Sequence, residues 1–242
     1  TSPYLNDYDK ITKRHHNLPH WQQEGKRYFV TWRLADSIPA ETLKQWQIER
    51  DTWVASNPEP WSEQQEEHYH REFSDRIDHL LDAAHGSCIL RKPEVATIVE
   101  NALRHFDGER YQLESFVIMP NHVHVAFELR PDHDLSDLMH SWKSFTAHAI
   151  NQALGLDGAL WQRDYFDRII RHGEHWKNVL RYIADNPSKA GLKEGFVAWR
   201  RDLGDEQIFT DVDAEAAETA ALPVALPVAL PVALPVALPV AL

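Results

Sequence analysis

Cysteine is almost absent from this chain, which has a single one, Cys88, among 242 residues. One thiol cannot form an intramolecular disulfide, and a metal site built from several thiolates is excluded. The chain also has no apolar run long enough to span a bilayer and no charged-then-apolar signal at its N-terminus. We therefore expect a protein of a reducing compartment, the cytosol.

Basic residues are also few, with 25 Lys and Arg against 37 Asp and Glu and a formal net charge of -12. This balance argues against a nucleic-acid partner, because phosphate binding depends on Lys and Arg. The distribution matters more than the sum. Residues 36–82 contain twelve acidic and four basic side chains, whereas residues 161–201 contain nine basic and five acidic ones. One surface can therefore bind a polyanion while an acidic segment carries most of the negative charge.

The length suits one substantial domain with appendages. We expect an N-terminal arm over residues 1–20, one domain over 21–205 with a helical insertion at about 38–86, and a disordered tail over 206–242. From Ala221 the tail repeats ALPV. A proline at every fourth position forbids a continuous helix, so an extended, dispensable tail is expected.

Hydrophobic periodicity predicts an α+β fold in which helices cover one face of a small antiparallel sheet, with an inserted acidic helical hairpin. A Pro-Asn turn joins two of the strands into a hairpin. Pro187 should end the last helix. The expected strands are Arg27–Ala35, Tyr111–Met119 and His122–Leu129, and the expected helices are Ala40–Ser56, Glu63–His85, one beginning at Pro93, Asp134–Leu154 and Glu174–Asn186.

The stretch PNHVHV, from Pro120 to Val125, places two histidines one residue apart. On a strand, His122 and His124 share one face while the intervening valines face the core. Two imidazoles on one side of a strand can bind one divalent ion. From the spacing alone, ordinary hydrogen-bonded histidines on a solvated face are the favoured interpretation, and His68 and His70 repeat the spacing in a helical segment where they diverge.

A second segment, HWKNVLRYIADNP, supports the hypothesis of a metal site. Beside its apolar stripe, Tyr182 and Asn186 are four residues apart and therefore neighbours on a helix surface. A phenol and an amide oxygen are thus presented together. An amphipathic tyrosine at the border of the core is the alternative interpretation.

FVIMPNHVHV, YFDRIIR and RYIADNPSKAGL together resemble the single-tyrosine HUH transposases of the insertion-sequence-200 type, in particular the REP-associated tyrosine transposases of bacteria. The resemblance runs from Leu18 to Arg200. It implies a ferredoxin-like α+β nuclease domain, a divalent metal, Mg²⁺ or Mn²⁺, and cleavage and joining of single-stranded DNA through a 5′-phosphotyrosine. Active proteins of this type often form homodimers, but no pattern in this chain establishes a dimer. The tail lies outside it.

Carried onto this chain, the resemblance implies that His122 and His124 bind the metal, that Asn186 completes the site and that Tyr182 is the nucleophile. Pro187 disfavours helical geometry at Asn186, so Asp185 is a substitute ligand. A phenol has an unperturbed pKa of about 10 and needs help to ionise. The sequence offers Arg181 or His175 beside Tyr182 for this purpose.

The expected partner is single-stranded or hairpin DNA of REP-like repeats. Six cations are candidates for contact with its backbone: Lys143, Arg163, Arg168, Arg171, Lys177 and Lys189. Three aromatic residues are candidate stacking platforms: Trp161, Tyr165 and Phe166. Tyr111 and Tyr165 are the rival nucleophiles. Two other functions stay open, a domesticated protein that binds hairpins without cutting them and a metallophosphoesterase that uses water in place of Tyr182.

Overall fold

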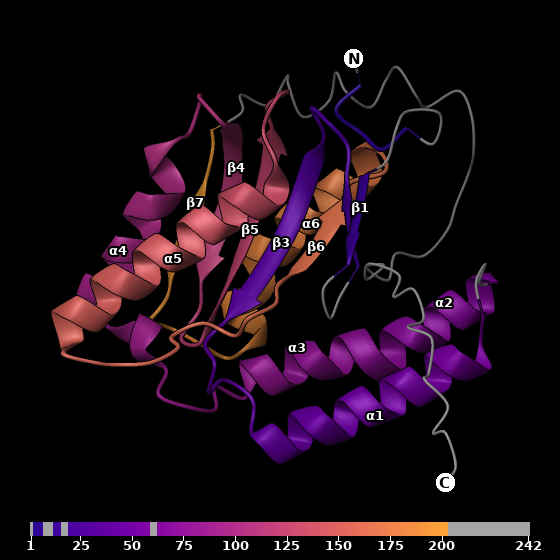
Figure 1. Ribbon diagram of the computed structural model, residues 1–242, viewed down its shortest axis with the longest axis horizontal. Coiled ribbons are helices and arrows are strands. Elements are labelled where there is room, and N and C mark those ends of the chain that lie inside the picture. The colour runs from indigo at the N-terminus through magenta and orange to yellow at the C-terminus, as the bar shows by residue number, and fades with distance from the viewer. Residues whose placement is uncertain (1, 7–11, 16–18, 59–61, 203–242) are drawn as a thin grey trace, which may run out of the picture.

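A five-stranded antiparallel sheet with strand order β6-β3-β5-β4-β7 forms the centre of the molecule (Figure 1). The computed structural model describes residues 2–6, 12–15, 19–58 and 62–202. The three predicted strands are confirmed, and two four-residue strands at the edges were not predicted. The strands are β3 (Arg27–Arg33), β4 (Tyr111–Ile118), β5 (His122–Leu129), β6 (Phe166–Ile169) and β7 (Val197–Arg200).

Helices cover both faces of this sheet, so the α+β class is confirmed but the expectation of helices on one face only is wrong. α4 (Pro93–His105) and α5 (Leu135–Leu154) cover the first face, and α6 (Gly173–Lys189) covers the second, behind the sheet in Figure 1. The reason is that the strands are apolar on both sides. Phe29 of β3 and Ala126 of β5 face α6, whereas their chain neighbours face α4 and α5.

The larger core lies on the first face. Val123, Val125 and Phe127 of β5 pack there with Trp142 of α5 and Trp32 of β3, and all five are nearly inaccessible to solvent. Burying each such side chain contributes about 1.5–3 kcal/mol. The second face is therefore left for a smaller core and for the polar residues described below.

A pair of helical arms lies beside the sheet, formed by α1 (Ala40–Ser56) and by α2 (Glu63–Tyr69), the π-helical turn η1 (His70–Ser74) and α3 (Asp75–Asp82). Both predicted helical segments are thus helical. This helical pair has its own small core around Trp46, Phe73 and Leu81. That the pair is an insertion into the domain stays a prediction.

The chain enters and leaves the helical pair at neighbouring points. The Ser87 backbone N–H donates to the Asp36 carboxylate at 2.7 Å, and Gly86 has a φ of +85°. A Cβ on Gly86 would lie 2.4 Å from the Asp36 carbonyl oxygen, so only glycine fits there. The two ends of the pair are consequently held together next to the sheet.

Part of the N-terminal segment that we expected as an arm packs against the sheet. Tyr4 is buried in the second core, and the Leu5 N–H donates to the Ile170 carbonyl at 2.8 Å. β1 (Thr12–His15) and β2 (Pro19–Gln22) pair with each other in antiparallel fashion. The predicted tail lies outside the described residues. Within the described part of the chain, no helix is long and apolar enough to cross a membrane.

Candidate active site

His122 and His124 lie on the second face of β5, between the sheet and α6. Their direct partners across the sheet are Arg33 and Thr31 of β3. The two histidines are only 1% and 2% exposed. The interpretation of a solvated histidine face is therefore wrong: α6, whose packing on this face the sequence analysis did not foresee, removes these imidazoles from water.

Hydrogen bonds orient both imidazole rings. His122 Nδ1 lies 2.8 Å from the Asn121 side-chain oxygen, and the Asn121 amide nitrogen donates to the carbonyls of Leu81 and His85. Because an amide oxygen only accepts, His122 must carry its proton on Nδ1. His124 Nδ1 lies 2.7 Å from the Thr31 hydroxyl. Because Nδ1 of each ring has a protein partner, Nε2 is the nitrogen of each ring that remains for a metal ion.

The two rings meet edge to face with their centroids 4.6 Å apart. Burial lowers the pKa of His122 to about 3, and burial together with the neighbouring His122 lowers the pKa of His124 well below its usual value. Both imidazoles are therefore neutral near pH 7. Neutral imidazole is the form that binds metal ions.

Tyr182 faces His124 from α6, and Asn186 lies about one turn further along the same helix. The Tyr182 ring centroid is 5.2 Å from that of His124 at an interplanar angle of 77°. Asn186 is 2% exposed. Its side-chain oxygen and His124 Nε2 are both buried without a hydrogen-bond partner among the described residues. Each such buried polar atom costs about 1–3 kcal/mol when nothing binds it, and a cation that reached both atoms would remove this cost.

The donor set fits a divalent metal of the expected kind. Two imidazole nitrogens and one amide oxygen leave positions for water and phosphate, which suits Mg²⁺ or Mn²⁺. The described residues contain no cluster of three or more His, Cys, Asp or Glu that could bind a metal ion. A three-ligand site that includes both histidines would therefore need a ligand of another type, such as the amide of Asn186.

α6 continues through Pro187 to Lys189, so the prediction that Pro187 ends this helix is wrong. Proline lacks an N–H and so cannot donate a helical hydrogen bond. Only one further turn follows it, so the helix loses little. The Asn186 carbonyl accepts from Ala190 N–H, and the Pro187 carbonyl accepts from Leu192 N–H at 2.8 Å. Asn186 therefore keeps helical geometry and is buried, while Asp185 is exposed to solvent.

Sequence analysis did not identify Asp78 of α3, which interacts with the candidate nucleophile Tyr182. Its carboxylate is a hydrogen-bond partner of the Tyr182 hydroxyl. Burial and, next, the Asp78 charge raise the pKa of Tyr182 well above 10, and burial raises the pKa of Asp78 to about 6. No spacing rule links the two residues, because the helical pair that contains Asp78 lies far from Tyr182 in sequence.

The helpers expected beside Tyr182 lie elsewhere. Arg181 is exposed and donates to the Asn178 side-chain oxygen at 3.2 Å. His175 is buried, accepts from the Arg171 backbone N–H and has its pKa lowered to about 3, chiefly by burial. Cations near the phenol come instead from Arg168 and from Lys189, whose ammonium lies 5.2 Å from the ring centroid.

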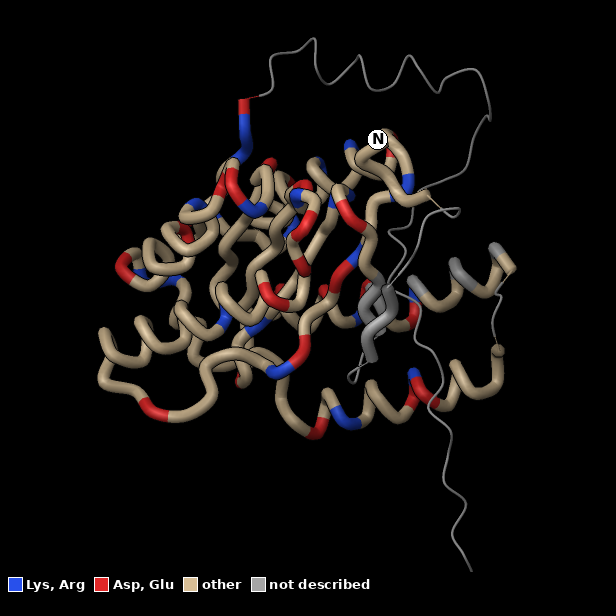
Figure 2. The backbone as a smooth tube through the Cα atoms, turned by 45° about the horizontal axis from the view of Figure 1, so that its top comes forward, with Lys and Arg blue, Asp and Glu red and all other residues tan. Residues whose placement is uncertain are grey.

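The six candidate DNA-contacting cations differ in exposure. Arg163, Arg171 and Lys189 are exposed, whereas Lys177 and Arg168 are partly covered. Lys143 donates to the backbone carbonyls of residues 162 and 163, and burial lowers its pKa to about 8. Figure 2 shows charges of both signs along the sheet and the helical pair. Contact with DNA stays a prediction for all six.

The rival tyrosines belong to the opposite face of the sheet. Tyr111 is fully buried and donates to the Leu103 carbonyl at 2.7 Å. Tyr165 and Trp161 are buried in the same core. Of the three predicted stacking residues, only Phe166 is partly exposed.

Comparison with known proteins gives a family match and two structural similarities. Residues 89–186 match the family described as transposase IS200 like. A structure of a REP-associated tyrosine transposase bound to a REP hairpin is 16% identical, with a TM-score of 0.41 over 74% of each chain. A crystal structure of a candidate transposase from Deinococcus radiodurans R1 is 14% identical, with a TM-score of 0.34 over 72% of this chain and 98% of that one. A search of curated proteins finds no match.

Proposed function

Residues 89–186 match the IS200-like transposase family, and on that premise we propose that this chain is a metal-dependent endonuclease and strand transferase. Its substrate is single-stranded DNA with hairpin repeats of the REP kind, and Tyr182 is the nucleophile. The family match itself supports DNA transposition and a DNA partner. The cleavage chemistry, the metal and the residue roles are the proposal.

One observation supports the proposal above the others: α6 and β5 bring His122, His124, Tyr182 and Asn186 together on the second face of the sheet. Two of these residues, His124 and Asn186, hold buried acceptors without partners. The Tyr182 ring contacts the ring of His124. A nucleophile beside an unsatisfied metal-ligand set suits phosphodiester cleavage better than it suits a packing role.

His122, His124 and Asn186 would hold the ion. When bound, it would neutralise negative charge on the scissile phosphate. Tyr182 attacks the phosphorus, and the bond between the phosphorus and the 3′ oxygen breaks. The upstream strand leaves with a free 3′-hydroxyl, whose oxygen takes a proton from water, while the downstream strand stays on the phenol through its 5′-phosphate. Asp78, with a pKa of about 6, is mostly ionised at pH 7 and accepts the phenol proton. Attack by a 3′-hydroxyl on the phosphotyrosine reverses these steps, so joining needs no ATP.

The test is formation of a covalent protein–DNA adduct. Purified wild-type protein and Tyr182→Phe are incubated with Mn²⁺ and labelled single-stranded hairpin DNA from the flanks of the gene, and adducts are scored after denaturation in SDS. We expect an adduct that EDTA abolishes and that Tyr182→Phe does not form. Tyr165→Phe is the matched control and should behave as the wild type.

A second function, hairpin binding without cleavage, is favoured by one feature. The Tyr182 phenol is largely covered and faces a carboxylate, which opposes its ionisation. Tight, salt-sensitive binding of the hairpin DNA with no adduct in the presence of any tested metal would support hairpin binding and refute the proposed enzyme activity. Product formed by Tyr182→Phe at the wild-type rate would point instead to a phosphoesterase that uses water.

A further inference from the structure

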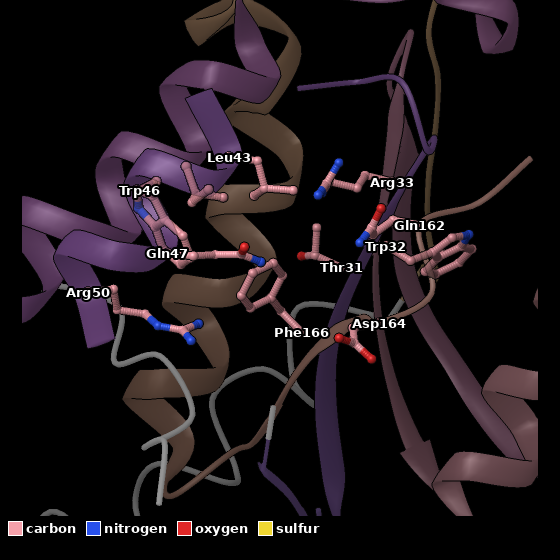
Figure 3. Close-up of a pocket in the computed structure, with 11 residues that line it drawn as sticks. Thr31, Trp32, Arg33, Leu43, Trp46, Gln47, Arg50, Gln162, Asp164 and Phe166 are labelled. Atoms are coloured by element: carbon pink, nitrogen blue, oxygen red, sulfur yellow. The ribbon is translucent and has the colours of Figure 1, made fainter. Parts of the chain in front are cut away.

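A groove separates the helical pair from the sheet (Figure 3). Its wall on one side is α1, with Gln47 and Trp46, and on the other the segment from Gln162 to Phe166. Thr31 lies at the floor. The α1 and β3 residues of this groove precede the family-matched segment 89–186, whereas the opposite wall lies within it.

The groove adjoins the candidate metal ligands. Thr31 is the cross-strand partner of His124 and bonds to its imidazole at 2.7 Å. Arg33, also on the groove, is the cross-strand partner of His122. Direct partners in antiparallel strands have Cβ atoms about 4.5–5.5 Å apart, which is less than the length of one nucleotide. A strand whose phosphate sits at the histidines therefore has a neighbouring nucleotide at this groove.

The cations of the groove are already engaged within the protein. Arg33 donates to the Ser37 hydroxyl at 3.0 Å and to the Leu34 carbonyl. Arg50 forms an ion pair with Asp51 and lies over the Trp46 ring. With these guanidinium groups occupied and an acidic residue on the wall, the groove is poorly suited to a phosphate.

The remaining side chains suit a nucleobase. Gln47 and Gln162 present amides, Asp164 presents a carboxylate, and the partly exposed Phe166 ring points into the groove (Figure 3). Amides read adenine by paired hydrogen bonds, and carboxylates accept from the amino group of cytosine. Aromatic rings stack on any base.

Both walls are held in place before any ligand arrives. Gln162 N–H donates to the Arg33 carbonyl at 2.9 Å, and Lys143 donates to the Gln162 carbonyl at 2.7 Å. On the other side the Trp46 indole N–H donates to the Phe73 carbonyl at 3.1 Å. A groove with fixed walls binds a base at a low cost in conformational entropy.

We propose that this groove binds the base of a nucleotide next to the scissile phosphate, stacked on Phe166, and that Gln47 and Asp164 select a base with an exocyclic amino group. The helical pair thereby contributes to the choice of the cleavage site. This inference rests on the proposed single-stranded DNA substrate.

The test measures binding separately from cleavage. Fluorescence anisotropy gives the affinity for homopolymeric single strands of deoxyadenosine, deoxycytidine and deoxythymidine, each about twelve nucleotides long. Thymine lacks an exocyclic amino group, so the wild type should bind the other two strands about fivefold more tightly or better. Gln47→Leu should reduce this preference, and Phe166→Leu should weaken binding of all three strands about fivefold or more.

Gln45→Leu is the matched control, because Gln45 is exposed on α1 two residues before Gln47 and therefore points about 200° away. It should keep the wild-type preference. Equal affinity for the three strands, or a base preference that Gln47→Leu leaves unchanged, would refute base selection by this groove. Tyr182→Phe should keep the base preference while losing the adduct. If only the adduct fails to form, the proposed nuclease activity is refuted. If only the base preference is absent, the proposed base binding in the groove is refuted.

Discussion

At the scale of single residues, the candidate site depends on groups that hold its main side chains in position. Thr31 and Asn121 bond to the Nδ1 atoms of the two histidines, and Asp78 bonds to the Tyr182 hydroxyl. The histidines, the tyrosine and the amide were identified from the sequence, where their spacing drew attention to them and the resemblance to a transposase family gave their roles. Thr31 and Asp78 could not be identified in this way, because they reach the site through strand pairing and helix packing.

Thr31→Val should weaken Mn²⁺ binding about 10- to 100-fold, because valine keeps the shape of threonine but cannot fix the orientation of the His124 ring. Isothermal titration with Mn²⁺ measures this without any DNA. Thr31→Ser retains the hydroxyl and should stay close to the wild type. A Thr31→Val protein with wild-type affinity would show that His124 is not a ligand.

Asp78→Asn should stabilise the protein at pH 8 by about 1 kcal/mol, a figure reduced because Asp78 is partly exposed. Folding raises the pKa of Asp78 to about 6. The carboxyl group therefore destabilises the fold progressively as pH rises from about 4 through 6, whereas asparagine does not titrate. Urea unfolding at pH 4 and pH 8 measures the effect, which should vanish at pH 4. Asp75→Asn, at an exposed position on the same helix, should show no such gain.

At the scale of elements, the position of the helical pair decides what surrounds Tyr182. Leu81 and His85, at the end of the pair, accept hydrogen bonds from Asn121, which also orients His122. The close approach of Gly86 to Asp36 holds the entry and exit of the pair together. The pair is therefore joined to the site by backbone as well as by side chains.

Gly86→Ala should lower the free energy of unfolding by about 2–4 kcal/mol, because it adds a clash with the Asp36 backbone to a strained positive φ. Gly108→Ala is the matched control, since Gly108 has a φ of +86° but open space around its Cα. It should cost only about 1 kcal/mol. Chemical denaturation of both variants gives the comparison. Equal losses would show that the contact with Asp36 is not a constraint.

At the scale of the whole molecule, a chain with a net charge of -12 must bind DNA through a local surface. The basic excess of residues 161–201 lies on β6, α6, β7 and the segments that precede and join them, while the helical pair has an acidic excess. Binding should then depend on few cations, each of which contributes about 0.7 to the slope of log affinity against log salt.

Lys189→Ala should weaken binding of single-stranded DNA and reduce the slope of log affinity against log salt by about 0.7, the value for one phosphate contact. Lys189 is exposed and lies beside the Tyr182 ring. Anisotropy titrations at several salt concentrations measure the slope. Lys44→Ala, on an exposed position of α1, should leave it unchanged. A wild-type slope in Lys189→Ala would exclude this lysine as a phosphate contact.

The sequence by itself determined the helices, the central strands and the residues of the motif, because hydrophobic periodicity and local spacing act over a few residues. His122 and His124 share a strand face, and Tyr182 and Asn186 share a helix face, for that reason alone. Only the tertiary structure decided that α6 covers the histidine face, that its last turn continues past Pro187 and that Asp78 reaches the phenol. Those features arise from packing between elements distant in the chain, which local periodicity does not encode.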